Sequence, residues 1–277
     1  MIQISKSDFE LALPVGTTAR DEVYEAIAPT ISVALDNYTG MLLGDAGLQR
    51  VEGDDCPMLL AYFKMLVSTD AFLSVFRQLD LVLTPTGFGI VSNDTLSPAS
   101  QQRVDALERQ LRTALCRARA MTVYLLRSPE WGRTVEARNF IRYIYSEHYF
   151  FFSPLGTGAR SFDDWQAMQP AIQDADEQLR LRFGDEQIDD MLDAYRRNDR
   201  DRMKLYAEAM QLVCDLTDHW KAKGAGVTTS PTMRRLIALM ENDADTFAPY
   251  HASSAYTAAH TPAFSNNKDS AAFLFNG

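Results

Sequence analysis

The chain contains four histidines, and their spacing matches no metal-binding or catalytic motif. They are His148, His219, His251 and His260, and neither an HExxH motif nor a Glu-x-x-His pair occurs. Asp215 and His219 are four residues apart on one expected helix, so they could share a metal ion or form an exposed ion pair. We favour the ion pair, because both positions lie at the polar edge of that helix. The histidines therefore predict no metal site.

Nucleophile and phosphate-binding motifs are equally absent from the sequence. The three cysteines, Cys56, Cys116 and Cys214, are far apart and form no CxxC pair, so we expect reduced, buried thiols. No GxSxG sequence occurs. The Gly156-Thr-Gly158 segment lacks the lysine and hydroxyl residue of a P-loop. The sequence thus predicts no catalytic residues and no cofactor, and we expect a protein that is not an enzyme.

Charge is unevenly distributed along a chain of 277 residues with a formal net charge of −10. Residues 91–160 carry 10 basic side chains, all arginine, against 6 acidic ones. The flanking blocks 1–90 and 161–223 are acidic. The overall charge excludes a protein that coats nucleic acid all over. An arginine-rich middle suits self-assembly or a local surface that faces DNA, and surface helices of mixed charge can also show this pattern.

Apolar periodicity and capping residues predict a mainly α-helical fold. We expect a proline kink at Pro29 in the first helix. Tyrosines and phenylalanines gather between 143 and 152, as part of the core or as a subunit interface. The expected helices cover about 20–38, 58–79, 98–127, 129–148, 162–183, 185–197, 199–223 and 231–245.

Three segments do not fit the helical pattern. Residues 1–18 are expected to be an extended N-terminal arm with weak strand character. Residues 81–91 read as a short β-hairpin inserted into the helical domain, which spans 19–246. Residues 247–277 are rich in Ala, Ser, Thr and Asn, and we expect an extended C-terminal tail. No stretch of about 18 apolar residues occurs, so no membrane span is expected.

The hairpin and tail segments carry a resemblance to a known family. The sequence Thr84-Pro-Thr-Gly-Phe-Gly-Ile-Val-Ser-Asn-Asp94, followed by Ser97-Pro-Ala-Ser-Gln-Gln-Arg-Val-Asp105, resembles a family from phages and prophages of Bacteroides-type bacteria. The ending Phe264-Ser-Asn-Asn-Lys-Asp-Ser-Ala-Ala-Phe-Leu-Phe275 is similar to that family's ending. The resemblance implies a head–tail connector, or head-completion adaptor, in the neck of the virion.

Such connectors are largely helical, form rings below the portal, and reach their neighbours through extended termini. The resemblance therefore implies a homo-oligomeric ring, twelve-fold in symmetry, that contacts the portal, tail-side proteins and packaged DNA. It also implies a location in the virion neck after synthesis in the bacterial cytoplasm. The residues that we expect at interfaces are Phe9, Leu11, Thr84, Pro85, Gly87, Phe88, Phe264, Phe273 and Phe275. Those that we expect to face DNA are Arg109, Arg112 and Arg119.

Two alternatives remain open from the sequence. The chain could be a cytoplasmic helical module that binds another protein. It could also be an enzyme with an unrecognised helical active site, which would require a deep pocket with a histidine or cysteine beside a carboxylate.

Overall fold

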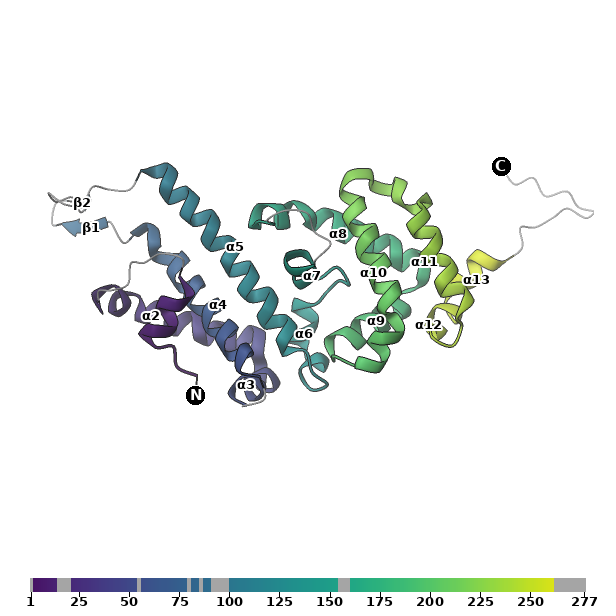
Figure 1. Ribbon diagram of the computed structural model, residues 1–277, viewed down its shortest axis with the longest axis horizontal. Helices are drawn as coiled ribbons and strands as arrows, with labels where there is room; N and C mark the ends of the chain where they lie inside the picture. The colour runs from purple at the N-terminus through teal and green to yellow at the C-terminus, as the bar shows by residue number, and fades with distance from the viewer. Residues whose placement is uncertain are drawn as a thin grey trace, which may run out of the picture.

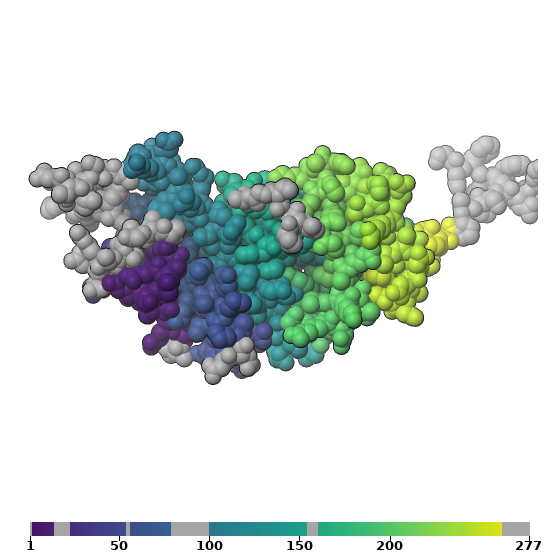
Figure 2. Space-filling model, in the orientation of Figure 1, coloured from purple at the N-terminus to yellow at the C-terminus, as the bar shows by residue number. Residues whose placement is uncertain are grey.

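The helices of this protein form two groups that meet along one long central helix. A computed structural model describes residues 2–13, 21–53, 56–78, 81–84, 87–90, 100–153 and 160–261. Figure 1 shows an elongated molecule with the N-terminal helices at one end and the C-terminal helices at the other. The space-filling view shows the same succession along the surface (Figure 2). Nearly all of the described regular structure is helical, which confirms a mainly α fold.

The N-terminal group is built around an apolar helix, α4. This helix is apolar on all sides because it packs against α1, α2 and α5. Together with the 3-10 turn η2 it is, among the described residues, the one helix long and apolar enough to cross a membrane, and its contacts are those of a core helix. The elements of the group are α1 (Lys6–Ala12), α2 (Asp21–Tyr38), the π-helix η1 (Thr39–Leu43), α3 (Gly44–Glu52), α4 (Pro57–Val75), η2 (Phe76–Gln78) and α5 (Gln101–Leu126).

Two short strands lie between α4 and α5. Strands β1 (Leu81–Thr84) and β2 (Gly87–Ile90) pair antiparallel, with Leu81 opposite Ile90 and Thr84 opposite Gly87. They lie at the outer end of the N-terminal group (Figure 1). At four residues each, they are a minor part of the fold.

The C-terminal group packs around α10. This helix contacts α8, α9 and α11. The two helices that follow α11 lie against α9 and α8, respectively. The elements are α8 (Phe162–Phe183), α9 (Asp185–Arg196), α10 (Arg200–Lys223), the 3-10 helix η4 (Gly224–Thr229), α11 (Pro231–Asn242), α12 (Ala248–His251) and α13 (Ser254–His260). Side-chain caps at Ser161, Asp199 and Ser230 fix where α8, α10 and α11 begin.

The link between the two groups differs from the single helix predicted over 129–148. It is divided into η3 (Trp131–Arg133), α6 (Val135–Phe140) and α7 (Glu147–Phe152). Thr134 and Ser146 cap α6 and α7, accepting from the backbone N–H of Ala137 and Tyr149. The prediction was wrong because these two hydroxyl residues start new helices within the apolar pattern.

Both termini also differ from the extended segments predicted. The N-terminal arm contains α1, which a capping box between Ser5 and Asp8 begins. The expected tail is helical as far as His260, and Phe247 and Tyr250 are buried in the core. Alternating apolar residues suggested a strand in the N-terminal segment, and the lack of helical periodicity suggested an extended C-terminal segment. In the structure, burial against the neighbouring helices stabilises helices in both segments. Pro29, the expected kink, lies inside a continuous α2.

Close packing joins the link to both groups of helices. Trp131 is fully buried, and its indole N–H donates to the Leu42 carbonyl at 3.0 Å. At the next residue, a Cβ on Gly132 would lie 2.6 Å from the carbonyl carbon and oxygen of Arg196. Because these are backbone atoms at the end of α9, they cannot move aside cheaply. Glycine is therefore required where η3 meets α9.

We expect Gly132→Ala to lower the free energy of unfolding by about 1–3 kcal/mol, the usual cost of forcing extra atoms into a packed site. Chemical denaturation monitored by circular dichroism measures the change. Gly226→Ala is the matched control, because a Cβ there meets nothing within 4 Å. Equal stability of the two variants would contradict the packing described.

Candidate functional site

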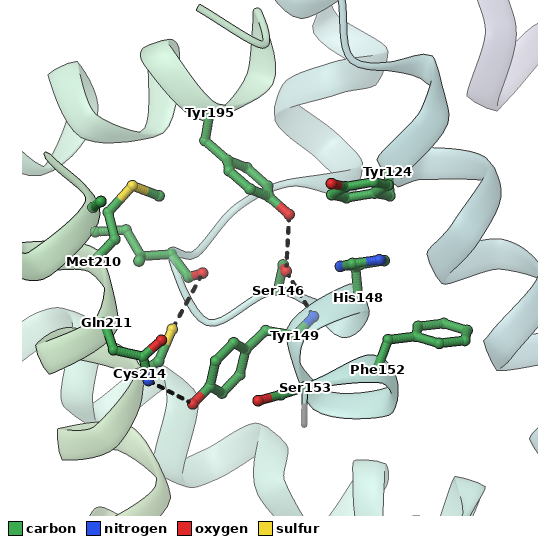
Figure 3. Close-up of a pocket in the computed structure, with 12 residues that line it drawn as sticks. Tyr124, Ser146, His148, Tyr149, Phe152, Ser153, Tyr195, Met210, Gln211 and Cys214 are labelled. Carbon is green, nitrogen blue, oxygen red and sulfur yellow. Dashed lines mark hydrogen bonds between the residues drawn. The ribbon is translucent and has the colours of Figure 1, made fainter. Parts of the chain in front are cut away.

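A groove lies where α5 and α7 meet α9 and α10. Its volume is about 340 Å³. Figure 3 shows the side chains of four separate segments converging on it. The lining residues are Tyr124, Ile144, Ser146, His148, Tyr149, Phe152, Ser153, Tyr195, Ala207, Met210, Gln211 and Cys214. None of them is an aspartate, glutamate, lysine or arginine, so the groove is suited to an uncharged, partly aromatic group.

Three aromatic rings are stacked along one wall of the groove. His148 lies 3.7 Å from Tyr124, with their planes 10° apart, and 5.2 Å from Phe152. His148 and Phe152 are four residues apart on α7, which places them on one face. Figure 3 shows Tyr124, His148 and Phe152 one below the other. Phe152 is 38% exposed and forms the accessible end of this stack.

A buried guanidinium anchors the other end of the wall. Arg127 is 4% exposed, and its guanidinium lies 4.0 Å from the ring centre of Tyr124 and 4.1 Å from that of Tyr195. Its Nε donates to the Tyr124 carbonyl at 3.0 Å. No carboxylate among the described residues pairs with it, so the two ring faces and the carbonyls stabilise the charge. This contact holds α5 against α9.

The ionisable groups of the groove are held in their neutral forms. Burial, with a contribution from the nearby charge of Arg127, lowers the pKa of His148 to about 4. Burial raises the pKa of the Cys214 thiol well above its ordinary range. A cysteine in this state is a poor nucleophile at neutral pH, because the thiolate is the reactive form. The groove therefore favours binding over covalent chemistry.

Polar contacts fix the opposite wall. The Gln211 amide donates to the Tyr149 hydroxyl at 3.2 Å and to Asp215 at 2.8 Å. The hydroxyls of Ser146 and Tyr195 are 3.3 Å apart. These bonds orient the side chains that Figure 3 shows around the opening. Asp215 thus binds Gln211, and the structure shows no ion pair between it and His219.

Arg119, expected to face DNA, is instead paired inside the molecule. Its guanidinium binds both carboxylate oxygens of Glu147, at 2.6 and 2.9 Å. Tyr38 and Asp70 lie close enough to interact electrostatically with it, and burial raises the pKa of both. The arginine was misassigned because its acidic partner lies 28 residues away in the sequence. This cluster joins α2, α4, α5 and α7.

Arg109 fits the expected DNA-facing role better than Arg112 does. Arg112 binds Glu108 at 2.7 Å and lies over the Phe162 ring. Arg109 is exposed and lines a second, open groove with Arg117, together with Gln110, Thr113 and the start of α8. Neither Arg109 nor Arg117 has an acidic partner among the described residues.

A stripe of exposed arginines follows from this arrangement. We call Arg103, Arg109 and Arg117 the α5 arginine stripe. Arg103 is also exposed and lacks an acidic partner in the described part of the chain. The acidic residues of α5, Asp105 and Glu108, instead bind Arg77. One face of α5 therefore carries positive charge that no carboxylate of the described residues pairs with, although Asp163 lies at its edge.

The remaining predicted contact residues have different environments. Phe9 is fully buried against Tyr24 and Phe72, so its assignment to an interface was wrong, while Leu11 on the same helix is 80% exposed. The strand residues are Thr84, Gly87 and Phe88, of which the structure gives the backbone pairing. Pro85, Phe264, Phe273 and Phe275 lie outside the described residues.

Among the described residues, the histidines form no metal-binding arrangement. No group of three or more metal-ligating side chains occurs there. The ring nitrogen of His251 lies 2.9 Å from the Met240 carbonyl, and that of His260 lies 2.9 Å from the Tyr256 carbonyl. Both rings also contact Tyr256. These histidines are bound within the C-terminal group of helices.

The groove was not predicted from the sequence. The spacing of His148 and Phe152 on one short helix was the available signal. Their partner Tyr124 and the facing Tyr195 lie far away in the sequence, and only folding brings them together. The aromatic cluster at 143–152 proves mostly core, since Tyr145, Phe150 and Phe151 are buried.

Comparison with known families gives one match. Residues 19–141 are similar to a family of unknown function, DUF6712. The matched stretch is less than half of the chain, and it contains α2 to α6 with the α5 arginine stripe. Neither a curated protein nor a solved structure matches the chain.

The pKa of His148 generates a test of the stacked wall. Between about pH 6.5 and 4 the unfolded chain binds a proton at this position that the folded chain does not, so stability falls as the pH falls through this window. We expect His148→Phe, which retains a ring, to lose less thermal stability than the parent protein between those pH values. Melting followed by circular dichroism measures this.

His219→Phe is the control for that experiment, because His219 is exposed on α10. We expect His148→Phe to lose less stability on acidification than this control. If His148→Phe behaved like this control, His148 would not be a neutral, buried member of the stack.

Proposed function

We propose that this chain is a structural protein of a tailed phage, a head–tail connector that forms a ring between portal and tail. The proposal rests on the resemblance of residues 84–105 and 264–275 to the connector family. It places the protein in the virion neck, as a homo-oligomer that we expect to be twelve-fold. Its partners would be the portal, the tail-side neck or tail proteins, and the packaged DNA.

The α5 arginine stripe is the structural observation that supports this proposal. Arg103, Arg109 and Arg117 form an exposed cationic face on a chain whose net charge is −10. Most other arginines of the described helices bind carboxylates or backbone carbonyls. A ring that surrounds DNA needs positive charge on the face toward the duplex and can be acidic elsewhere. The stripe has this distribution.

Exposed apolar side chains support contacts between copies. Leu11 and Val33 are exposed on the N-terminal helices, and Leu181 and Leu205 on the C-terminal ones. Because these two surfaces belong to opposite groups of helices, contact between them would be head to tail. Head-to-tail contacts generate rings when the rotation closes. We further propose that the hairpin at 81–91 and the end of the chain reach neighbouring subunits.

The structure offers less to the alternatives. An active site was expected to place histidine or cysteine beside a carboxylate, and the groove contains His148 and Cys214 with no carboxylate among its lining residues. A protein-binding module is supported by the groove itself. The connector and the binding module differ in assembly, because a connector forms rings and a binding module need not.

Native mass spectrometry of the recombinant chain with its cognate portal tests the proposed function. We expect a closed oligomer that binds the portal with one defined stoichiometry. A chain that stays monomeric and does not bind the portal would contradict the proposal and favour the binding module.

The DNA-facing role is tested by replacing Arg103, Arg109 and Arg117 together with glutamine. For the assembled ring, we expect weaker binding to duplex DNA and a weaker salt dependence. The slope of log K against log salt should fall by about 0.9 for each phosphate that the variant no longer neutralises. Fluorescence anisotropy over a range of salt concentrations measures the slope.

The control for the stripe replaces Arg200, Lys204 and Lys221 with glutamine. These residues carry the same number of charges on α10, and their replacement should leave the salt slope unchanged. Equal weakening of DNA binding in both variants would show that net charge, and not the α5 arginine stripe, governs binding.

A further inference from the structure

The groove between α7 and α10 has a feature that ring formation alone does not use. It is lined by an exposed aromatic side chain, Phe152, and, on the side of α10, by the flexible side chain of Met210. Both residues line a space of about 340 Å³, near the lower end of the range for specific small pockets, about 300–1,000 Å³. Such a space accommodates one or two apolar side chains. Methionine suits this role because its unbranched side chain adapts to the group it contacts.

The same chain contains a segment of matching chemistry. Residues 270–277 have the sequence Ser-Ala-Ala-Phe-Leu-Phe-Asn-Gly, which contains no charged side chain. The groove likewise is lined by no charged side chain, and the pKa of His148 keeps its ring neutral. In an extended chain, Phe273 and Phe275 point to the same side, so both could enter one groove. The match is between an uncharged aromatic segment and an uncharged aromatic groove.

The place where the described chain ends favours a groove on another copy. Helix α13 ends at His260, at the end of the molecule's long axis (Figure 1). The groove is lined by residues of α7 and α10, and α7 lies toward the middle of the molecule (Figure 1). A segment returning to its own groove would have to pass back over the C-terminal helices, whereas a neighbouring subunit at that end is reached without reversal.

The segment is long enough to extend well beyond the end of α13. Phe273 follows Thr261 by twelve residues. An extended chain of this length spans at most about 40 Å. The Tyr149 hydroxyl, which accepts from Gln211, lines the groove and is a polar group that the backbone of the incoming segment can contact. The groove thus offers both apolar contact and a polar anchor.

We propose that the segment around Phe273-Leu-Phe275 of one subunit docks into the groove between α7 and α10 of the next. The inference rests on the proposed function insofar as it requires neighbouring copies. It gives the groove a binding role and identifies the site to which the segment binds. Each subunit then donates one aromatic segment and receives another, which is a heterologous contact.

Photo-crosslinking of the full chain tests this directly. A benzophenone amino acid replaces Phe273, and ¹⁴N- and ¹⁵N-labelled subunits are mixed, assembled and illuminated. Mass spectrometry of the peptides then identifies the residue reached and whether the linked pair carries both labels. We expect crosslinks to α7 and α10 at the groove, near Phe152 and Met210, with mixed-label pairs as frequent as random mixing of subunits requires.

A matched pair of variants tests the groove independently. Ala207 and Ala222 are both exposed on α10, but only Ala207 lines the groove. Ala207→Glu should reduce the crosslink yield severalfold by placing a charge at the opening, whereas Ala222→Glu should not. Crosslinks confined to single-label pairs, crosslinks to other surfaces, or equal yields in the two variants would each overturn the inference.

These outcomes separate the inference from the function on which it rests. A ring that binds the portal but crosslinks elsewhere refutes the docking alone. Mixed-label crosslinks in the groove without portal binding refute the connector and support the docking.

Discussion

The contact of one buried cation with two tyrosine rings determines how the two groups of helices meet. Arg127 is almost completely enclosed, and no carboxylate in the described part of the chain neutralises it. An unpaired charge in the interior is costly, so the rings of Tyr124 and Tyr195 and the nearby carbonyls must remain in place around it. Because Tyr124 belongs to α5 and Tyr195 to α9, the spacing of these helices is set by the thickness of the stack. The contact of Gly132 with Arg196 fixes the same junction nearby.

The groove and the arginine stripe both depend on this junction. Tyr124 stacks on His148 while it contacts Arg127, so the wall of the groove begins at the cation itself. The same charge helps to lower the pKa of His148, which keeps the groove uncharged. Helix α5 also carries the exposed arginines farther toward its N-terminus. A single helix therefore links the surface that we assign to DNA with the groove that we assign to a neighbouring subunit.

Helices with strong local signals were predictable from the sequence. The predicted boundaries of α8, α9 and α10 agree closely with the structure, because capping side chains and glycines mark them. The tail was mispredicted because its apolar residues are few. Its helices are held by distant partners, such as Phe183 against Tyr250 and Gln187, which accepts from the Tyr250 N–H.

The candidate site was less predictable than the fold. The sequence showed that residues 91–160 are rich in arginine, but not which of these arginines would be neutralised. Arg119 and Arg112 have acidic partners, whereas Arg109 has none among the described residues, and this difference depends on the rotation of α5 against its neighbours. The groove is assembled from four segments that have no common sequence signature. Local sequence patterns thus predict the helices, whereas the arginine stripe and the groove depend on tertiary packing.

The orientation of α5 in the assembled particle tests the central claim most directly. Electron cryomicroscopy of the chain bound to its portal would show which face of each subunit surrounds the channel. The account predicts a closed ring in which Arg109 and Arg117 of every subunit point toward the axis. A ring with α5 on its outer surface, or an acidic face toward the channel, would contradict it.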